Sequence, residues 1–351
     1  MIQQALYHTY QRYKTLHSHV ITAMPIVILM PHSACNCRCV MCDIWKGNRN
    51  LKQLTEKDIK GLLATLRQFK TKQVLMSGGE ALLNPHFFQF CKILRKEKIN
   101  ITLLSTGLLL QQHAAALIEN VNDIIVSLDG DEKLHDTIRN IPGAYQKLKD
   151  GVQYIKSINP FYKITARTVI HKLNFQSWPQ IIDAAKNIGL DQISFLPADV
   201  SSTAFNRQIA WDEERRESVM LQMDQLSELK KIVDELICDH VADFENGFIA
   251  ESPEKINRIY TYYCALHGLN SFPYKKCNAP WVSTVIEADG VVRPCFFHPE
   301  IGNIKTDSLD AILNGTKAKQ FRRALDIDSD EICQRCVCSL NLPPHVNPSL
   351  K

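Results

Sequence analysis

The sequence lacks the features that mark three broad classes of protein. Its formal net charge is only +4 over 351 residues, and the charges are interspersed without a basic block or basic–aromatic stripe, so no nucleic-acid partner is indicated. The one candidate signal segment, the apolar run from Val20 to Met30, contains Pro25, lacks a convincing cleavage site and is too short to span a membrane. No internal repeat or low-complexity tract is present. We therefore expect a reduced, cytoplasmic protein that does not enter a membrane, with a buried strand in this run.

Cysteine, in contrast, is abundant and unevenly placed. There are twelve cysteines, and nine of them fall into two groups. The first group is Cys35, Cys37, Cys39 and Cys42, and the second is Cys277, Cys295, Cys333, Cys336 and Cys338. In a chain this long without a secretory signal, clustered cysteines indicate metal ligands rather than disulfides.

Between the two groups, short apolar runs alternate with segments of helical periodicity. The runs are 26–30, 73–76, 99–104, 123–128, 164–170 and 192–196, and the helical segments are 58–69, 85–96, 111–119, 144–157 and 178–188. This alternation predicts an α/β fold with a parallel sheet and crossover helices, open or curled into a barrel. In such folds the active site lies at the carboxyl ends of the strands.

The chain is expected to divide into four regions. These are an N-terminal helix (1–24), a core domain (25–200), a helical bridging segment (201–276) and a C-terminal domain (277–351) that contains a hairpin around Asp289–Gly290. The bridging segment is predicted to contain one long helix from Asp212 to His240. Apolar residues at helical spacing predict one buried face for the N-terminal helix, and they are Ile2, Leu6, Tyr10, Tyr13 and Leu16.

The spacing C-x3-C-x2-C of Cys35, Cys39 and Cys42 suits an incompletely ligated 4Fe–4S cluster. Three thiolates bind three irons and leave the fourth open, whereas an electron carrier normally supplies a fourth cysteine. An open iron can chelate the amino and carboxylate groups of methionine, which would place S-adenosylmethionine (SAM) to accept an electron. A structural zinc site or inert core thiols are the alternatives, since Cys37 offers a fourth sulfur; its crowded spacing favours a small apolar role for it.

The segment 35–42 resembles the signature of the radical SAM superfamily, with Met41 where an aromatic residue is usual. The resemblance implies a partial (β/α)6 barrel over residues 26–196, more open than the eight-stranded form. It also implies reductive cleavage of SAM to a 5′-deoxyadenosyl radical that takes hydrogen from a substrate, with a reductant such as flavodoxin or ferredoxin as electron donor.

Polar motifs follow the later strands and are the candidate SAM contacts. Gly78 and Gly79 allow close backbone approach to a ligand, and Glu80 would accept from its ammonium group; the three resemble the family's methionine-amine motif. The other candidates are Ser105, Ser127 and Asp129 at strand ends, and Arg139 for the cofactor carboxylate. Helix capping and surface ion pairing remain the alternative roles, and Arg167 within a predicted strand needs a partner in either case.

Four thiolates of the second group, Cys277, Cys295, Cys333 and Cys336, come from two separated segments, as in a closed metal site. Structural zinc fits four cysteines well. The segment nevertheless resembles the auxiliary iron–sulfur domain called SPASM, or Twitch in its one-cluster form, which implies one auxiliary 4Fe–4S cluster. Cys338 could replace Cys336 as a ligand, and Cys264 is a further alternative.

The sequence leaves the substrate open between a small molecule and a peptide. The segment before the first strand is too short for an obvious peptide-binding module, which favours the small molecule. Three residues after the sixth strand, Asp199, Asn206 and Arg207, could contact substrate or be solvated loop residues. The rival function is a non-catalytic zinc or iron–sulfur metalloprotein, although a structural site has no need of the Gly78-Gly79-Glu80 motif.

Overall fold

The structure is a computed structural model, and it describes residues 2–204, 207 and 209–346. Its centre is a curved sheet in which six strands from the first half of the chain are neighbours in the order β6-β5-β4-β3-β2-β1, each pair parallel. These strands are β1 (Ile26–Leu29), β2 (Gln73–Met76), β3 (Asn100–Ser105), β4 (Asp123–Ser127), β5 (Ile164–Ile170) and β6 (Gln192–Pro197). The predicted α/β fold class with a parallel sheet is therefore confirmed.

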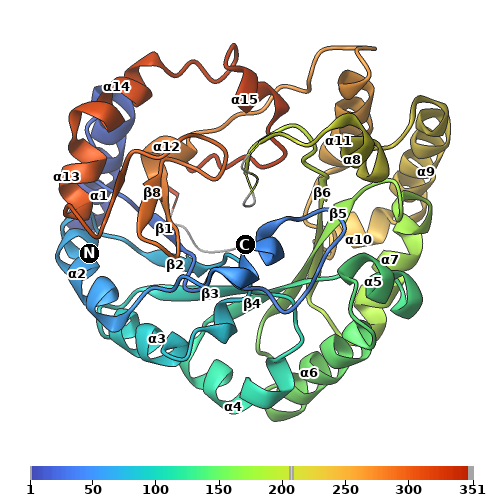
Figure 1. The fold of residues 1–351 in the computed structure, drawn as a ribbon, viewed down its shortest axis with the longest axis horizontal. Helices are drawn as coiled ribbons and strands as arrows, with labels where there is room; N and C mark the ends of the chain where they lie inside the picture. Colours follow the sequence, from blue (N-terminus) through green and yellow to red (C-terminus); the bar gives the residue numbers. More distant parts are fainter. Residues whose placement is uncertain (1, 205–206, 208, 347–351) are drawn as a thin grey trace.

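Helices cover the outer side of this sheet, and the concave side faces the centre of the molecule (Figure 1). The helices that follow successive strands are α2 (Glu56–Gln68), α3 (Phe87–Lys96), α4 (Leu110–Asn120), α5 (Glu132–Arg139), α6 (Ala144–Ile158) and α7 (Trp178–Ile188). In β5 every second residue is fully buried, and the alternate residues, Arg167 among them, are half-buried. This period of two places one set of side chains against the helices and the other on the concave face. Within the described residues, none of the helices combines the length and hydrophobicity that crossing a bilayer requires.

The C-terminal segment extends the same sheet. β7 (Ser283–Ile286) pairs in parallel with β1, and β8 (Val291–Arg293) and β9 (Gly302–Asn303) continue it antiparallel. The predicted hairpin is the β7–β8 turn, where Gly290 has a φ of 89° that favours glycine. Four short helices complete this segment, α12 (Ala279–Val282), α13 (Leu309–Asn314), α14 (Thr316–Ala324) and α15 (Glu331–Arg335). β6 and β9 are the ends of the sheet as described, so the strands form an open, curved array.

The N-terminal helix is present as α1 (Ile2–Ser18). Of its predicted buried face, Leu16 is half-buried and packs against a small hydrophobic cluster, the side chain of Ile2 lies outside the described residues, and the other three positions are wrong. Leu6, Tyr10 and Tyr13 are 65%, 58% and 53% exposed. Arg12 and Thr15 are buried instead, and the Thr15 hydroxyl accepts hydrogen bonds from the backbone that enters β1. The backbone amides that precede β1 need hydrogen-bond acceptors, and this need decides which face of α1 turns inward. The spacing of apolar residues alone does not reveal that face.

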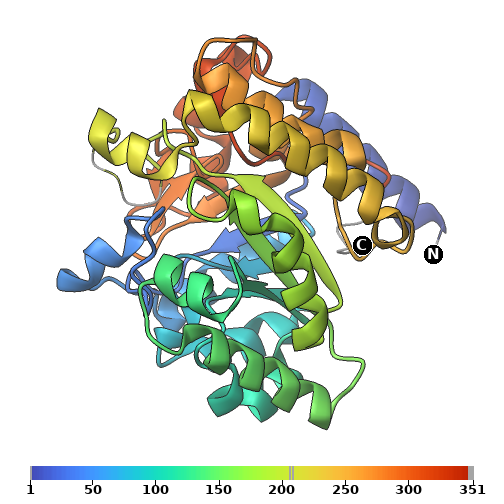
Figure 2. The ribbon, with the colours of Figure 1, turned by 90° about the vertical axis from the view of Figure 1, so that its right-hand side faces the viewer.

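The predicted long helix in the bridging segment is also wrong. The chain forms α8 (Glu213–Val219), a single 3-10 turn (Met223–Gln225) and α9 (Leu226–Asp239). Val219, Met220 and Leu221 are all buried, and Met220 is extended with ψ 139°. Three consecutive residues cannot share one face of a helix, so burying all of them requires a break. Beyond the break, α9 runs beside α11 (Pro253–Leu266), as both views show (Figure 2).

Candidate functional site

The first cysteine group lies on an irregular loop at the carboxyl end of β1. Asn48 fixes the start of this loop, because its side chain accepts from the amide of Cys35 at 3.0 Å and donates to the carbonyl of Cys35 at 2.9 Å. The amide of Arg38 donates to the carbonyl of Arg139 at the end of α5, at 3.0 Å. The amide of Val40 likewise donates to the carbonyl of Ile138, also at 3.0 Å. The three predicted ligands are thus presented on one anchored loop.

Burial controls the protonation of these thiols. It raises the pKa of Cys35 and that of Cys42 to about 12. Cys39 differs, because a hydrogen bond from the buried Cys37 lowers its pKa, and Arg139, with Nη1 3.4 Å from the Cys39 sulfur, acts in the same direction. Thiolates are the metal-binding form, so a metal bound here must displace protons from at least two of the thiols.

Glu80 is fully buried and joins the second strand to the cysteine loop. Its amide donates to the carbonyl of Ala34 at 2.8 Å. Oε2 accepts from the Ser105 hydroxyl at 2.9 Å and from the amide and hydroxyl of Thr106, both at 2.8 Å, while Oε1 accepts from the Leu82 amide at 3.2 Å. A carboxylate oxygen has two lone pairs, and Oε1 accepts from the Leu82 amide alone, so Oε1 retains room for one more donor. Ser105 is therefore engaged by Glu80, and Thr106, which the sequence did not single out, shares this role.

Gly79 is where the two loops touch. A Cβ at Gly79 would lie 2.1 Å from the carbonyl oxygen of Ala34 and 3.1 Å from the amide nitrogen of Cys35. We expect Gly79→Ala to lower stability by about 1–3 kcal/mol or more, because both obstructing atoms are backbone and the loops must separate. The measurement is the midpoint of thermal unfolding, together with iron content after anaerobic reconstitution.

The matched control is Gly61→Ala on the exposed face of α2, where a Cβ meets nothing within 4 Å. In a helix this change is expected to be neutral or to stabilise by up to about 1 kcal/mol. Equal midpoints for the two variants would contradict the close approach of the loops.

Asp129 and Arg139 form a buried ion pair next to Cys39. Asp129 follows β4 and also accepts from the amide of Val169 on β5 at 3.2 Å. The Nε of Arg139 is buried without a hydrogen-bond partner among the described residues, so this guanidinium can accommodate a further acceptor such as a ligand carboxylate. Ser127, at the carboxyl end of β4, is half-buried and lies opposite Arg167 in the β4–β5 register.

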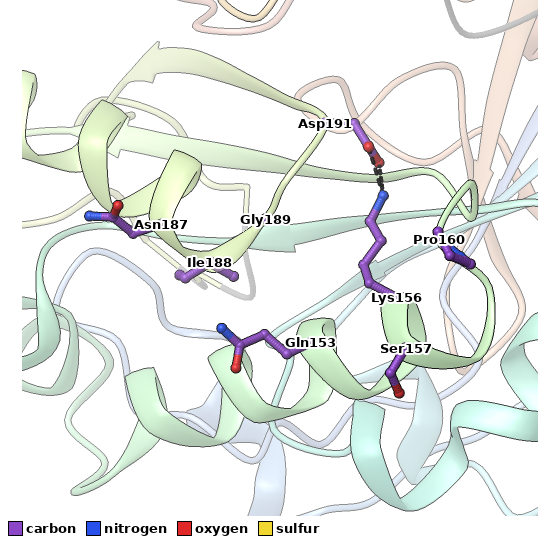
Figure 3. A pocket seen from close by; sticks show the side chains of 8 residues that line it. All are labelled: Gln153, Lys156, Ser157, Pro160, Asn187, Ile188, Gly189 and Asp191. Carbon is purple, nitrogen blue, oxygen red and sulfur yellow. Dashed lines mark hydrogen bonds and ion pairs between the residues drawn. The ribbon is translucent and has the colours of Figure 1, made fainter.

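A cavity of about 970 Å³ opens beside these loops. Gly78 and Gly79 line it from the loop after β2, Asp43 and Lys46 from just after the cysteine loop, and Phe297 from the C-terminal segment. A second hollow, of about 500 Å³, lies on the outer surface near the Lys156–Asp191 ion pair (Figure 3). Asp191 directly precedes β6, so this hollow is at the amino end of the sheet and belongs to no predicted site.

The segment after β6 forms a wall of the large cavity and was only partly foreseen. Asp199 and Arg207 pair with each other at 2.9 Å and are buried, while Asn206 lies outside the described residues. The guanidinium of Arg207 lies 3.8 Å from the ring centre of Trp211, and Trp211 Nε1 donates to Asp43 at 2.8 Å. Because Asp43 follows Cys42 directly, this wall is fastened to the cysteine loop. A lone tryptophan in a charged stretch was the only signal for it in the sequence.

The second cysteine group also gathers in one neighbourhood. Burial is the largest cause of the raised pKa of Cys333 and Cys336, and the charge of Cys295 raises both further. Cys277 contributes to the raised pKa of Cys333 in the same way. Lys275, which no sequence motif indicated, donates to the carbonyls of Gln334 and Cys336 and so holds the C-x2-C turn.

Cys338 lies on the side of this group that faces the core. It is half-buried, and burial raises its pKa. Arg167 on the concave face and Asp199 are the next influences on it, the first lowering and the second raising its pKa. Cys264, the other alternative ligand, is buried in α11 within the main hydrophobic core.

The spacing of the thiols tests the zinc interpretation. Tetrahedral zinc with bonds of about 2.3 Å to sulfur places its ligand sulfurs about 3.8 Å apart. Among the described residues, no three cysteine sulfurs lie within 4.8 Å of one another; the one ligand group that compact is His298, Asp330 and Cys333. Both cysteine groups are therefore more open than a four-thiolate zinc site, as a larger inorganic group requires.

Comparison with known proteins agrees with this arrangement. Residues 29–185 match the family profile of the radical SAM superfamily, and residues 277–337 match that of an iron–sulfur cluster-binding domain, SPASM. The chain is 22% identical over 316 residues to the subtilosin biosynthesis protein AlbA of Bacillus subtilis, covering 87% of this chain and 62% of AlbA. It is 24% identical over 161 residues to an AdoMet-dependent heme synthase of Methanosarcina barkeri, covering 45% of this chain and 46% of that protein. The matches thus span about half to two thirds of these relatives.

The fold has close counterparts among solved structures. SuiB of Streptococcus suis, bound to S-adenosylmethionine, superposes with a TM-score of 0.63 at 14% identity, covering 98% of this chain and 80% of SuiB. The protein anSMEcpe with bound AdoMet gives a TM-score of 0.64 at 18% identity, covering 89% of this chain and 86% of anSMEcpe. The solved structures share the fold, and the two family profiles, which together match more than half of the chain, show that it is a member of the radical SAM superfamily with a C-terminal SPASM-type iron–sulfur domain.

Proposed function

We propose that this protein is an enzyme in which Cys35, Cys39 and Cys42 hold a 4Fe–4S cluster that reacts with SAM. When bound, these groups supply a one-electron reductive cleavage that yields a 5′-deoxyadenosyl radical able to take hydrogen from a substrate. The observation that carries the proposal is the direct contact between a three-thiol loop and the Gly78–Glu80 loop at the edge of a large cavity. Three thiolates leave one iron for a ligand.

The chain's own residues have distinct tasks in this proposal. Glu80, with one free acceptor position, would hold the ammonium group of SAM, and Arg139, with its unpartnered Nε, would hold the carboxylate. Gly78 and Gly79 let their loop pack closely against the backbone at His32 and Ala34, at the edge of the cavity where the methionine part would lie. Ser105 positions Glu80, and Ser127 and Asp129 provide polar groups at the strand ends for the ribose.

A second, auxiliary 4Fe–4S cluster is proposed on Cys277, Cys295, Cys333 and Cys336. Four cysteine ligands would leave it no open iron, which suits electron transfer rather than substrate binding. Lys275 would place a positive charge beside an anionic cluster. We assign the core to residues 25–200, the bridging segment to 201–276 and the auxiliary domain to 277–351, with a protein such as flavodoxin or ferredoxin as electron donor.

A peptide is the substrate class that the relatives covering most of this chain support. AlbA and the sporulation killing factor maturation protein SkfB, both from Bacillus subtilis, match 87% and 83% of this chain, and both names describe bacteriocin or killing-factor production. SuiB has been solved with its precursor peptide SuiA. These matches weigh against the expectation of a small molecule, and the cavity beside the cysteine loop, bounded by Trp211 and Phe297, is where a peptide segment would enter.

The test is product analysis on the full chain after anaerobic reconstitution with iron and sulfide. Reduction with dithionite in the presence of SAM is expected to release 5′-deoxyadenosine, and iron and sulfide analysis is expected to give two clusters per chain. Bound zinc without sulfide, or no 5′-deoxyadenosine despite a full cluster content, would refute the assignment.

A further inference from the structure

A histidine that the sequence did not indicate lies inside the second cysteine group. His298 follows β8, is 3% exposed, and places Nε2 3.3 Å from the sulfur of Cys333. Asp330 lies on the same side, with Oδ1 3.8 Å from His298 Nε2. Asp330 also caps α15 by accepting from the amide of Cys333 at 2.8 Å. Three potential ligand atoms are thereby held together by one helix turn and one loop.

The short distance excludes one obvious role. In a cubane each iron takes a single protein ligand, and ligands on different irons point away from one another. Donor atoms that lie 3.3 Å apart therefore cannot both bind the same cluster. If Cys333 is a cluster ligand, His298 is not a second one.

The proton on His298 has a preferred position. A neutral imidazole carries one N–H, and its other nitrogen is an acceptor. Nε2 faces a cysteine sulfur and a carboxylate oxygen, both of which accept hydrogen bonds, so the tautomer with hydrogen on Nε2 is favoured. The ring itself is fixed by an edge contact with Phe321 at 4.9 Å between ring centres.

We propose that His298 donates an N–H···S hydrogen bond to the Cys333 thiolate of the auxiliary cluster and thereby sets the reduction potential of that cluster. This inference rests on the proposed auxiliary centre. Hydrogen bonds to the sulfurs stabilise the more negative, reduced state and raise the potential. His298 is thus a positioning residue that acts through Cys333 and touches no reacting atom.

The experiment is a redox titration followed by electron paramagnetic resonance. It uses the full chain with Cys35, Cys39 and Cys42 replaced by alanine, so that only the auxiliary cluster reports. His298→Leu is expected to shift the midpoint potential to more negative values with unchanged iron content. His298→Gln keeps an N–H donor, so its midpoint potential is expected to lie much closer to that of the parent protein. Phe321→Leu is the matched control, since it alters packing around the same ring and keeps the donor.

A second measurement needs no variant at position 298. In the reduced protein, pulsed electron paramagnetic resonance is expected to detect a proton that is coupled to the cluster. The signal of this proton is expected to disappear when the solvent is deuterium oxide, because the proton exchanges. The proposal is overturned by an unchanged potential in His298→Leu, by a directly bonded nitrogen coupling, or by zinc bound in a His298-dependent manner. Absence of any cluster in the parent protein would instead defeat the auxiliary centre itself, and is distinguished by its iron content.

Discussion

Replacing Cys39 by alanine is expected to reduce 5′-deoxyadenosine formation to background. Cys39 is the middle ligand of the three, and it is the thiol whose pKa Cys37 and Arg139 lower, which favours the metal-binding thiolate. Loss of one ligand from a three-thiol site leaves two irons without protein ligands, so the cluster should not assemble stably. The loss should exceed the roughly 10–100-fold effect that is typical of removing only an outer-shell partner of a metal site. The measurement is 5′-deoxyadenosine per chain after reduction with dithionite.

Cys37→Ala is the matched control, because it removes a thiol from the same loop and from an equally buried position. Cys37 donates to Cys39 but is not a proposed ligand. This variant is expected to retain its cluster and to lose only part of its activity, because the pKa of Cys39 rises when the hydrogen bond is absent. Wild-type product formation by Cys39→Ala, or complete loss in Cys37→Ala with retention in Cys42→Ala, would show that the ligand set is wrong.

The spacing of apolar residues and of cysteines along the sequence predicted the parts of this molecule that depend on neighbouring residues. The apolar runs identified the six parallel strands β1 to β6, although not the parallel pairing of β7 with β1. Because parallel strands end at one edge, the positions of Gly79, Glu80 and Asp129 near that edge followed from chain order alone. The C-x3-C-x2-C spacing identified the loop that these groups surround.

The errors and omissions depend on contacts that hydrophobic periodicity does not record. The inward face of α1 is decided by Thr15, whose hydroxyl serves backbone amides at Thr22 and Ala23. The break after Val219 is decided by the core that receives it. Trp211 reaches Asp43 across 168 positions, and His298 reaches Cys333 across 35. No periodicity within a window of the chain records such pairs, so these contacts could be found only in three dimensions.

Arg139→Leu is the substitution expected to cost the most stability. It would leave the Asp129 carboxylate, which is 0% exposed, without its charged partner. Breaking a buried ion pair by removing one member typically costs about 3–5 kcal/mol, because the remaining charge stays buried without compensation. The same change removes the cation 3.4 Å from Cys39, so cluster content should fall as well. The measurements are the thermal unfolding midpoint and the iron content of the reconstituted protein.

Two further variants separate the charge from the packing. Arg67→Leu removes the same side chain from an exposed pair with Glu97, and its midpoint is expected to stay close to that of the wild type. The double variant Asp129→Leu/Arg139→Leu leaves no unpaired charge, so it should recover part of the stability that Arg139→Leu loses, yet it should not recover the cluster. A double variant no more stable than Arg139→Leu would mean that packing, not the uncompensated Asp129 carboxylate, causes the loss. Full recovery of the cluster would mean that Cys39 does not need the guanidinium. Stability at this position therefore depends on pairing the Asp129 charge, whereas the cluster depends on the positive charge that Arg139 brings to Cys39.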